Sequence, residues 1–409
     1  MAEERPPSER RSAEAVAVAV EDPSANLGPQ LLRLARRNRS EAIEKLRALP
    51  PDRQARACLD LRPALRSDFL DLVDSPESVV PLLPEAELTI TLRAGGMSEA
   101  AWLLEVATPA QRRACFDLDC WYGVSDPEGK VIDLSRAYEW TEALIEAGRS
   151  TLIAALEETD AEFWVLLLRA MVDLAIPSGE EERPGEGWFT ADGSVYFTPK
   201  PGVDPGRVQQ IFGVLAERSP PLYWRLVYGI LFESTASCEE EAWRWRTARM
   251  ADLGFPDRES AMRIYRPLLP AQAPTWTVPA RSGEIAASLE LPSAIAGSLI
   301  AEALAELPEQ RAAELTGYVL AVANAVAVAD GLRLSEPDSI PMALEKAIRG
   351  IEIGLRELAE LRGLRLHEVL DVTAPVDLFR IGATKSEEIR PVPRQESDPA
   401  DPQEVDPNA

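Results

Sequence analysis

The sequence predicts a mostly α-helical protein made of stacked, repeat-like short helices, with one small β-hairpin and disordered ends. Three observations carry this prediction: a central helix that is apolar all round, short helices that begin at prolines, and a single Asp-Gly hairpin signal. The 409 residues, 46% of them hydrophobic, suffice for two or three domains with packed cores.

The central stretch is residues 159–176, TDAEFWVLLLRAMVDLAI. Its apolar side chains cover nearly the whole circumference of a helix, so we expect it to be buried. Thr159 with Glu162 predicts a capping box at its start, and Pro177 predicts its end. At about 14–16 residues it is too short to span a bilayer, which favours a soluble core.

Short amphipathic helices precede this stretch. Residues 49–54, 83–87 and 108–112 each place a proline, with acidic or polar neighbours, where a helix begins. We expect residues 28–176 to form a helical repeat-like domain. Residues 1–27 are rich in Glu, Arg, Pro and Ser, which predicts a disordered arm.

Residues 177–205 are predicted to be a linker that contains the hairpin. Asp192-Gly193 lies between two runs of aromatic and β-branched residues, a sequence typical of a two-residue type I′ turn. Because an isolated hairpin is marginal in water, its aromatic side chains should lie on the helical body.

Residues 206–270 are predicted to be an aromatic-rich helical segment that packs on the first domain. Pro220–Phe232 is apolar nearly all round and suits packing against the central helix, and Ser237 with Glu240 predicts a capping box. Then follow a Pro-rich connector at 271–292, a C-terminal helical domain at 293–383, and a disordered acidic tail at 384–409.

The formal charge of −25 argues against nucleic acid as a partner, since neutralising phosphates needs grouped Lys and Arg. It also disfavours anionic membrane surfaces. The longest uncharged run, Leu315–Ala329, is about 15 residues and contains Asn324, so we expect no membrane insertion.

The four cysteines include no Cys-x-x-Cys pair, and the N-terminus has no secretory leader pattern. We therefore expect reduced thiols in a cytoplasmic protein. The acidic loop 117–133 does not fit an EF-hand, because Val124 and Ser135 stand where carboxylates are required. A solvated turn is the main interpretation and weak divalent binding the alternative; no metal site or cofactor is predicted.

Catalytic patterns are not found in the sequence. His367, the single histidine, has no neighbouring thiol or serine motif, and no glycine-rich phosphate loop occurs. Pairs such as Asp117 with Asp119 are common among 68 acidic residues and do not by themselves indicate acid–base chemistry. We expect that the protein is not an enzyme.

The least ordinary feature is a concentration of aromatic residues with interleaved arginines between residues 188 and 265. One interpretation is an aromatic core with arginines stacked on it; the other is a concave site for an anionic ligand or acidic peptide. The candidate ligand-binding residues for the second are Arg244, Arg246, Arg263, Trp243 and Trp245.

Two family resemblances concern different parts of the chain. The first is to a bacterial family known only as a domain of unknown function, which implies no activity. It is carried by residues 116–121 (FDLDCW), 243–246 (WRWR), 251–256 (ADLGFP), 265–268 (YRPL) and 378–382 (LFRIG). The second is to the superhelical cytosolic domain of MgtE-type magnesium transporters. Residues 30–156 resemble that domain in beginning their helices with a leucine-proline-acid pattern.

These observations favour an interaction scaffold or adaptor that binds a protein partner, since short helices provide a surface and catalytic groups are missing. The alternative is a sensor that holds a small anion in the arginine-aromatic segment.

Overall fold

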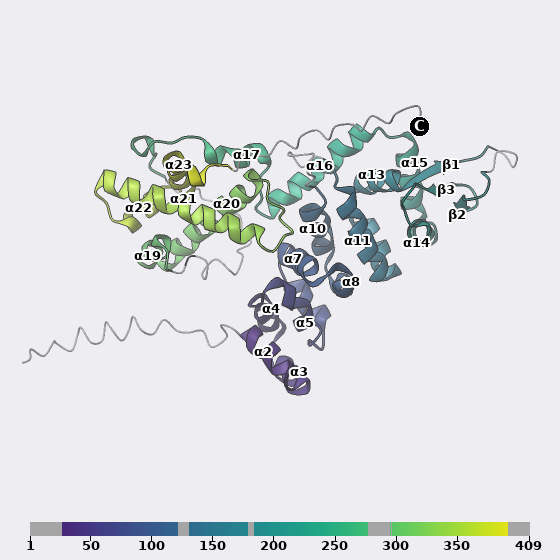
Figure 1. Ribbon diagram of the computed structural model, residues 1–409, viewed down its shortest axis with the longest axis horizontal. Coiled ribbons are helices and arrows are strands. Elements are labelled where there is room, and N and C mark those ends of the chain that lie inside the picture. The colour runs from purple at the N-terminus through teal and green to yellow at the C-terminus, as the bar shows by residue number, and fades with distance from the viewer. Residues whose placement is uncertain (1–26, 122–130, 179–183, 277–294, 296, 392–409) are drawn as a thin grey trace, which may run out of the picture. The chain divides into compact units, whose positions relative to one another are not determined.

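The structure, a computed structural model, describes residues 27–121, 131–178, 184–276, 295 and 297–391 (Figure 1). It is mostly helical with one small sheet, which confirms the predicted fold class. The chain forms two compact units, 1–83 and 84–409, a division that falls inside the predicted 28–176 domain. Most of the predicted arm at 1–27, and 392–409 of the predicted tail, lie outside the described residues.

The first unit is a set of short helices around a small core. Leu46, Cys58 and Phe69 are among its buried side chains. A Cβ on Gly28 would lie 2.0 Å from the Ala57 carbonyl oxygen, so only glycine permits this approach of the first helix to the third. The elements are α2 (Leu27–Ala35), α3 (Arg39–Arg47), α4 (Pro51–Leu59), η1 (Pro63–Leu65), α5 (Arg66–Leu70), α6 (Pro76–Val79) and η2 (Val80–Leu82).

The second unit begins with more short helices: α7 (Glu85–Gly95), α8 (Met97–Ala100), α9 (Leu103–Val106), α10 (Pro109–Asp119), α11 (Leu134–Glu146) and α12 (Arg149–Glu158). The proline-based starts predicted for α4, α7 and α10 are confirmed. At the start of α10 the backbone amide of Gln111 donates to Thr108 Oγ1 at 3.1 Å, and the Gln111 side-chain Oε1 accepts from the backbone amide of Thr108 at 2.8 Å.

The central helix is α13 (Ala161–Met171), and its burial is confirmed. The Phe163 ring lies 5.0 Å from Phe116 of α10 and 5.4 Å from Trp164. The predicted capping box is wrong: Asp160 occupies the N-cap, its side chain accepts no hydrogen bond from the first turn of the helix, and the Glu162 carboxylate binds Arg225 instead.

The predicted end of this helix at Ile176 is also wrong, because the chain leaves the helix after Met171 and forms strand β1 (Val172–Ala175). This strand completes a three-stranded antiparallel sheet of order β1-β3-β2, with β2 at Phe189–Thr190 and β3 at Tyr196–Pro199. Pairing with β3, more than twenty residues away in sequence, outweighs the local helical preference.

The predicted hairpin is confirmed, but its turn is not a two-residue one. Phe189 pairs with Phe197 and Thr190 with Tyr196, so five residues, 191–195, connect the strands. Asp192 Oδ1 orders this loop by accepting from the amides of residues 194 and 195, both at 2.9 Å. As expected, the aromatic side chains lie on the helical body: the Phe197 ring is 4.0 Å from that of Phe212.

Phe212 belongs to α14 (Pro205–Arg218), and α15 (Pro220–Phe232), α16 (Thr235–Asp252), α17 (Arg258–Met262), η4 (Arg263–Tyr265) and η5 (Pro270–Gln272) follow. Packing of α15 on α13 is confirmed: a Cβ on Gly229 would lie 2.4 Å from Val165 Cγ2. The capping box predicted at Ser237 is wrong, because α16 begins earlier and Ser234 Oγ caps it by accepting from the Ser237 amide at 3.1 Å.

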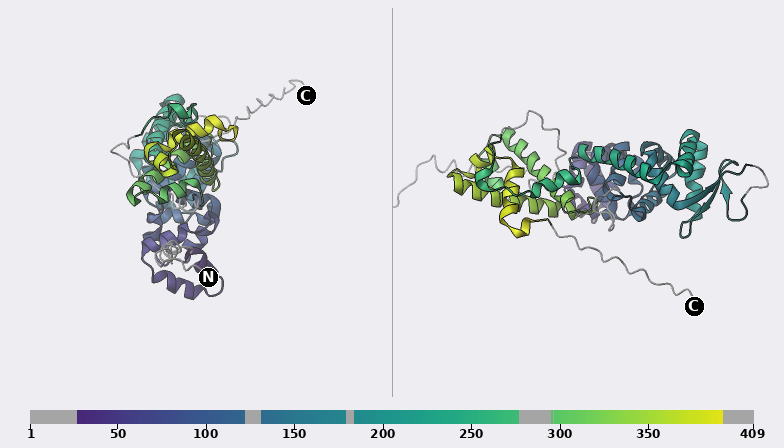
Figure 2. Two further views of the ribbon diagram at one scale, coloured as in Figure 1. Left: turned by 90° about the vertical axis from the view of Figure 1, so that its left-hand side faces the viewer. Right: turned by 90° about the horizontal axis from the view of Figure 1, so that it is seen from above.

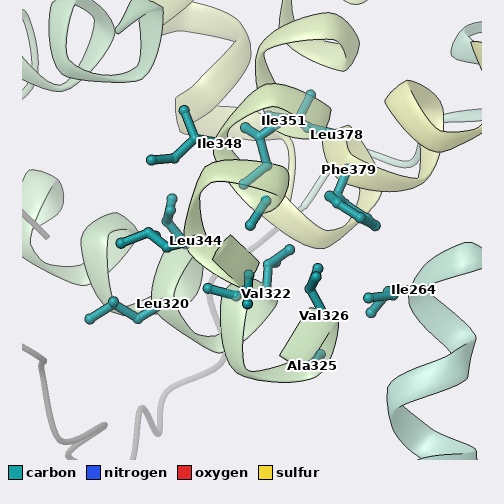
Figure 3. Packing of buried hydrophobic residues seen from close by; sticks show 14 of the residues in the cluster. Ile264, Leu320, Val322, Ala325, Val326, Leu344, Ile348, Ile351, Leu378 and Phe379 are labelled. Atoms are coloured by element: carbon teal, nitrogen blue, oxygen red, sulfur yellow. The ribbon is translucent and has the colours of Figure 1, made fainter. Parts of the chain in front are cut away.

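The C-terminal bundle contains α19 (Leu299–Ala305), α20 (Glu309–Ala329), α21 (Ser339–Arg362), α22 (Leu366–Val372), α23 (Pro375–Lys385) and η6 (Glu387–Ile389). Figure 2 shows this green-to-yellow bundle from two further sides. Its core joins Val322 and Val326 of α20 to Leu344 and Ile351 of α21 and to Phe379 of α23 (Figure 3).

Two predicted boundaries of this region change. Ile389 is buried against the bundle, so the prediction of disorder from residue 384 is wrong for 384–391. Residues 277–294 of the predicted connector lie outside the described residues, but its start packs on the bundle: the Trp276 amide donates to the Val372 carbonyl at 2.8 Å.

Among the described residues, α20 is the one helix long and apolar enough to cross a membrane by length and composition. Of its most apolar window, 56% is buried within the structure. Its buried valines and alanines contact α21 and α23, and this role as core helix accounts for its composition.

Candidate functional site

The predicted arginine-aromatic residues do not converge on one site. Arg244 is exposed with its guanidinium 5.7 Å from the Trp245 ring, whereas Arg246, two positions later, points into the protein. Arg263 lies outside α16, is exposed, and pairs with Glu259 at 3.0 Å. Trp243 is half-buried and Trp245 about half exposed. These residues therefore do not form a concave arginine cluster.

The buried arginine instead belongs to an ionic network around the FDLDCW motif of α10. Arg246 Nε donates to the Asp117 carbonyl at 2.8 Å, and its guanidinium carbon lies 5.5 Å from the Trp121 ring. Arg249, one turn further along α16, donates to both carboxylate oxygens of Asp117, at 2.6 and 3.0 Å, and to both of Asp160, at 3.2 and 2.7 Å.

Asp119 is the second buried acid of this motif. Its carboxylate accepts from Trp140 Nε1 at 2.8 Å and from Ser335 Oγ, and Arg93 Nε lies 3.4 Å away. Burial raises the pKa of both Asp117 and Asp119, and the surrounding donors oppose that rise. The network joins α10 to α16 and to the segment after α20. Because protein donors enclose both carboxylates, it does not form an open acid–base site.

The four cysteines are enclosed in the same way. Cys58, Cys115, Cys120 and Cys238 are free and buried, and burial raises the pKa of Cys115 to about 12. The described residues contain no group of three or more His, Cys, Asp or Glu side chains arranged to hold a metal. Residues 122–130 of the acidic loop lie outside the described chain, so the divalent-binding alternative for that loop stays a prediction.

A row of aromatic rings on α15, exposed at its last two members, is a feature that packing within the described residues does not explain. Trp224, Tyr228 and Phe232, here called the aromatic ladder, are spaced four residues apart and so share one helix face. Consecutive rings lie 5.8 Å apart at interplanar angles of 35° and 29°. Tyr228 is 54% exposed and Phe232 72% exposed.

Acidic residues follow the ladder in the sequence. Glu233 follows Phe232 directly and, with Glu241 of α16, lines a cavity of about 250 Å³. Arg225 balances part of this charge by pairing with Glu162 at 2.7 Å and with Glu233 at 2.8 Å. Within the described chain, no ion pair involves Glu240 or Glu241, and both are exposed, so their charges face solvent.

The opposite face of α15 is fixed to α13. Arg169 of α13 donates to the carbonyl oxygens of Gly229 at 2.6 Å, Ile230 at 3.2 Å and Glu233 at 2.7 Å. The carbonyls of Ile230 and Glu233 lie at the C-terminal end of α15, where a helix leaves acceptors without partners, and the Gly229 carbonyl also accepts from the Glu233 backbone amide at 3.1 Å. The ladder is therefore carried by a helix whose far side and end are both held.

The sequence analysis counted Trp224 and Tyr228 within the aromatic-rich segment but chose none of the three ladder residues as a candidate ligand-binding residue. The signal that identifies the ladder is its spacing: three aromatic residues at i, i+4 and i+8 on a helix that is apolar nearly all round. Such a helix has more apolar surface than one neighbour covers.

Comparison with known proteins decides the family. A family profile matches residues 43–391, which is most of the chain. The chain belongs to DUF6178, a family of unknown function. This match confirms the resemblance to a domain of unknown function, and the quoted segments all lie within it. No curated protein and no solved structure matches the chain. The resemblance of the N-terminal helices to MgtE-type transporters has no support from these comparisons.

Proposed function

We propose that this DUF6178 chain is a non-enzymatic, cytoplasmic helical scaffold or adaptor that binds a protein partner through the aromatic ladder. The observation that carries the proposal is the exposure of Tyr228 and Phe232 beside Trp224 on a firmly held helix. Tyr and Trp are enriched among residues that dominate binding energy at protein interfaces. A contiguous exposed apolar patch on a folded protein marks an interaction surface.

The exposed area of the ladder sets its contribution to the binding free energy. Covering the exposed parts of Tyr228 and Phe232 removes roughly 250 Å² of mainly apolar surface from water, about 6 kcal/mol before other costs. Association itself costs about 4–15 kcal/mol in lost freedom of motion. The ladder is therefore an anchor that needs further contacts around it, as expected for the centre of a larger interface.

The test is affinity purification from the native cell with the wild-type chain and the double variant Tyr228→Ala/Phe232→Ala, read by mass spectrometry. Leu361→Ala is the matched control, because Leu361 is 57% exposed on α21, away from α15 in sequence. We expect a stoichiometric partner that the wild type and the control retain and the double variant loses. Equal recovery with all three chains, or no stoichiometric partner, would contradict the proposal.

A further inference from the structure

The C-terminal bundle contains a cavity of about 250 Å³ beside α20. Its walls come from one face of α20, from the start of α23, and from Ile264 and Trp276, which precede the bundle in the sequence. We propose that this cavity binds a small neutral aromatic molecule that carries one polar group, such as a phenol. The inference goes beyond the proposed function and depends on none of the residues of the aromatic ladder.

The sequence of α20 explains why this space exists. Tyr318, Ala321 and Ala325 stand at positions i, i+3 and i+7, so they share one face of the helix. The two alanines extend only one carbon from the backbone and leave room beside Ile264 and Trp276, which line the same cavity; Figure 3 labels Ile264 and Ala325. Protein interiors are close-packed, and a void of this size lowers stability when nothing fills it.

The aromatic wall of the cavity is held in place. The Trp276 and Tyr318 rings lie 4.9 Å apart at an interplanar angle of 88°, an edge-to-face arrangement. The Trp276 amide donates to the Val372 carbonyl at 2.8 Å, and the Arg311 guanidinium carbon lies 5.1 Å from the Trp276 ring. Arg311 is itself fixed by Asp371, whose carboxylate and backbone carbonyl each accept a hydrogen bond from it at 2.7 Å. A site with fixed walls loses little freedom when a ligand binds.

The lining favours a neutral ligand with a single polar group. None of the described residues that line the cavity is charged, so an ionised ligand would lose its hydration without gaining a partner. The Tyr318 hydroxyl is buried and has no hydrogen-bond partner within the described chain. A ligand hydroxyl would supply that partner, and a ligand ring would contact the two aromatic rings of the wall.

The volume of the cavity limits the size of the ligand. An apolar cavity of about 150 Å³ is known to bind benzene, which has six carbon atoms. By proportion, 250 Å³ admits a ligand of about ten heavy atoms, such as a benzene ring with a hydroxyl and a short alkyl chain.

Calorimetric titration of the full chain with three related compounds tests the inference. The probes are para-ethylphenol, ethylbenzene, which lacks the hydroxyl, and para-ethylbenzoate, which is ionised at neutral pH. We expect para-ethylphenol to bind with a Kd on the order of 0.1 mM. Ethylbenzene should bind about two- to tenfold more weakly because it leaves Tyr318 without a partner, and para-ethylbenzoate at least about tenfold more weakly.

Substitutions in the wall place the binding in this cavity. Ala321→Phe should fill the space and weaken binding of para-ethylphenol by at least about tenfold. Met342→Phe is the matched control and should leave binding unchanged, because Met342 is 57% exposed on α21 and is not among the described residues of the lining. Tyr318→Phe keeps the ring and removes the hydroxyl. It should abolish the preference for para-ethylphenol over ethylbenzene and raise the melting temperature of the ligand-free chain, since a buried hydroxyl without a partner is removed.

Three results would overturn the inference: no binding of para-ethylphenol at millimolar concentration, equal affinity for para-ethylbenzoate, or unchanged affinities in both Ala321→Phe and Tyr318→Phe. If Ala321→Phe does not fold, the ratio of the two neutral probes in Tyr318→Phe decides. The ladder variant Tyr228→Ala/Phe232→Ala should bind para-ethylphenol as the wild type does, because neither residue lines the cavity. Failure of this inference is therefore distinguishable from failure of the proposed function.

Discussion

The buried pair between Arg249 and Asp117 gives the sharpest test of how the second unit is held together. Arg249 on α16 makes four hydrogen bonds to two carboxylates, those of Asp117 on α10 and Asp160 before α13. Replacing Arg249 with Met keeps much of the side-chain volume and removes all four. We expect Arg249→Met to destabilise the folded chain strongly.

The size of the destabilisation follows from the buried carboxylate that the substitution leaves without its partner. The Asp117 side chain is 5% exposed, so its carboxylate cannot regain water when the guanidinium is removed. An uncompensated buried charge of this kind costs about 3–5 kcal/mol. Asp160 is more accessible, at 20% exposed, and adds less. A unit that spans residues 84–409 has an unfolding entropy that gives about 1.5 °C per kcal/mol, so the melting temperature should fall by about 4–8 °C.

The same variant has a defined pH dependence. Burial raises the pKa of Asp117, and hydrogen bonds and charge from Arg249 oppose that rise. Without Arg249 the folded-state pKa rises further, while the unfolded value stays near about 4. At a pH between the unfolded-state and folded-state pKa of Asp117, the folded chain binds a proton that the unfolded chain lacks. The penalty of Arg249→Met should therefore shrink as the pH falls from about 7 towards 5.

Thermal and urea unfolding of matched variants provide the measurement. Adding Asp117→Asn to Arg249→Met should recover much of the lost stability, because the buried group is then neutral. Arg263→Met is the control: its pair with Glu259 is 55% and 81% exposed, so its loss should cost well under about 1 kcal/mol. A penalty for Arg249→Met that equals the control, or that does not change with pH, would refute the reasoning.

Two further predictions concern packing and thiols. Gly354→Ala should destabilise the C-terminal bundle by about 2–4 kcal/mol, because its Cβ would lie 2.0 Å from the Leu378 carbonyl oxygen. Gly213→Ala on α14, where a Cβ would meet nothing within 4 Å, should instead stabilise the chain by about 0.5–1 kcal/mol. Urea unfolding of the two variants compares these free energies. A thiol reagent at about pH 8 should modify the four buried cysteines rapidly only after unfolding, since burial keeps groups such as Cys115 protonated; fast modification of the native chain would contradict this.

Local signals in the sequence located most of the helices. Proline and N-cap chemistry act within one turn, so the starts of α4, α7 and α10 were predictable. Strand β1 was not predictable in this way. Val172–Ala175 continues an apolar helical pattern, and only its pairing with Tyr196–Pro199 makes it a strand.

The candidate site was harder to predict because burial depends on neighbours distant in sequence. Arg244 and Arg246 have the same local sequence context, yet only Arg246 faces α10 and reaches the Asp117 carbonyl. Asp117 itself is one acid among 68, and nothing local indicates that Arg249, 132 residues later, encloses it. Likewise, the pattern of α15 shows excess apolar surface but not which face α13 covers.

The contrast between the two faces of α15 makes the ladder suitable for binding. On the inner face, Gly229 allows α13 to approach closely and Arg169 holds three carbonyls at the end of the helix. On the outer face, each ring of the ladder is restricted by its neighbour 5.8 Å away. Little backbone or side-chain freedom remains to be lost on binding, so more of the roughly 6 kcal/mol from covering Tyr228 and Phe232 appears as affinity. Loosening the inner face with Arg169→Met should therefore weaken partner binding, even though among the described residues Arg169 donates to the carbonyls at the end of α15 and to Thr235 and to no side chain of the ladder.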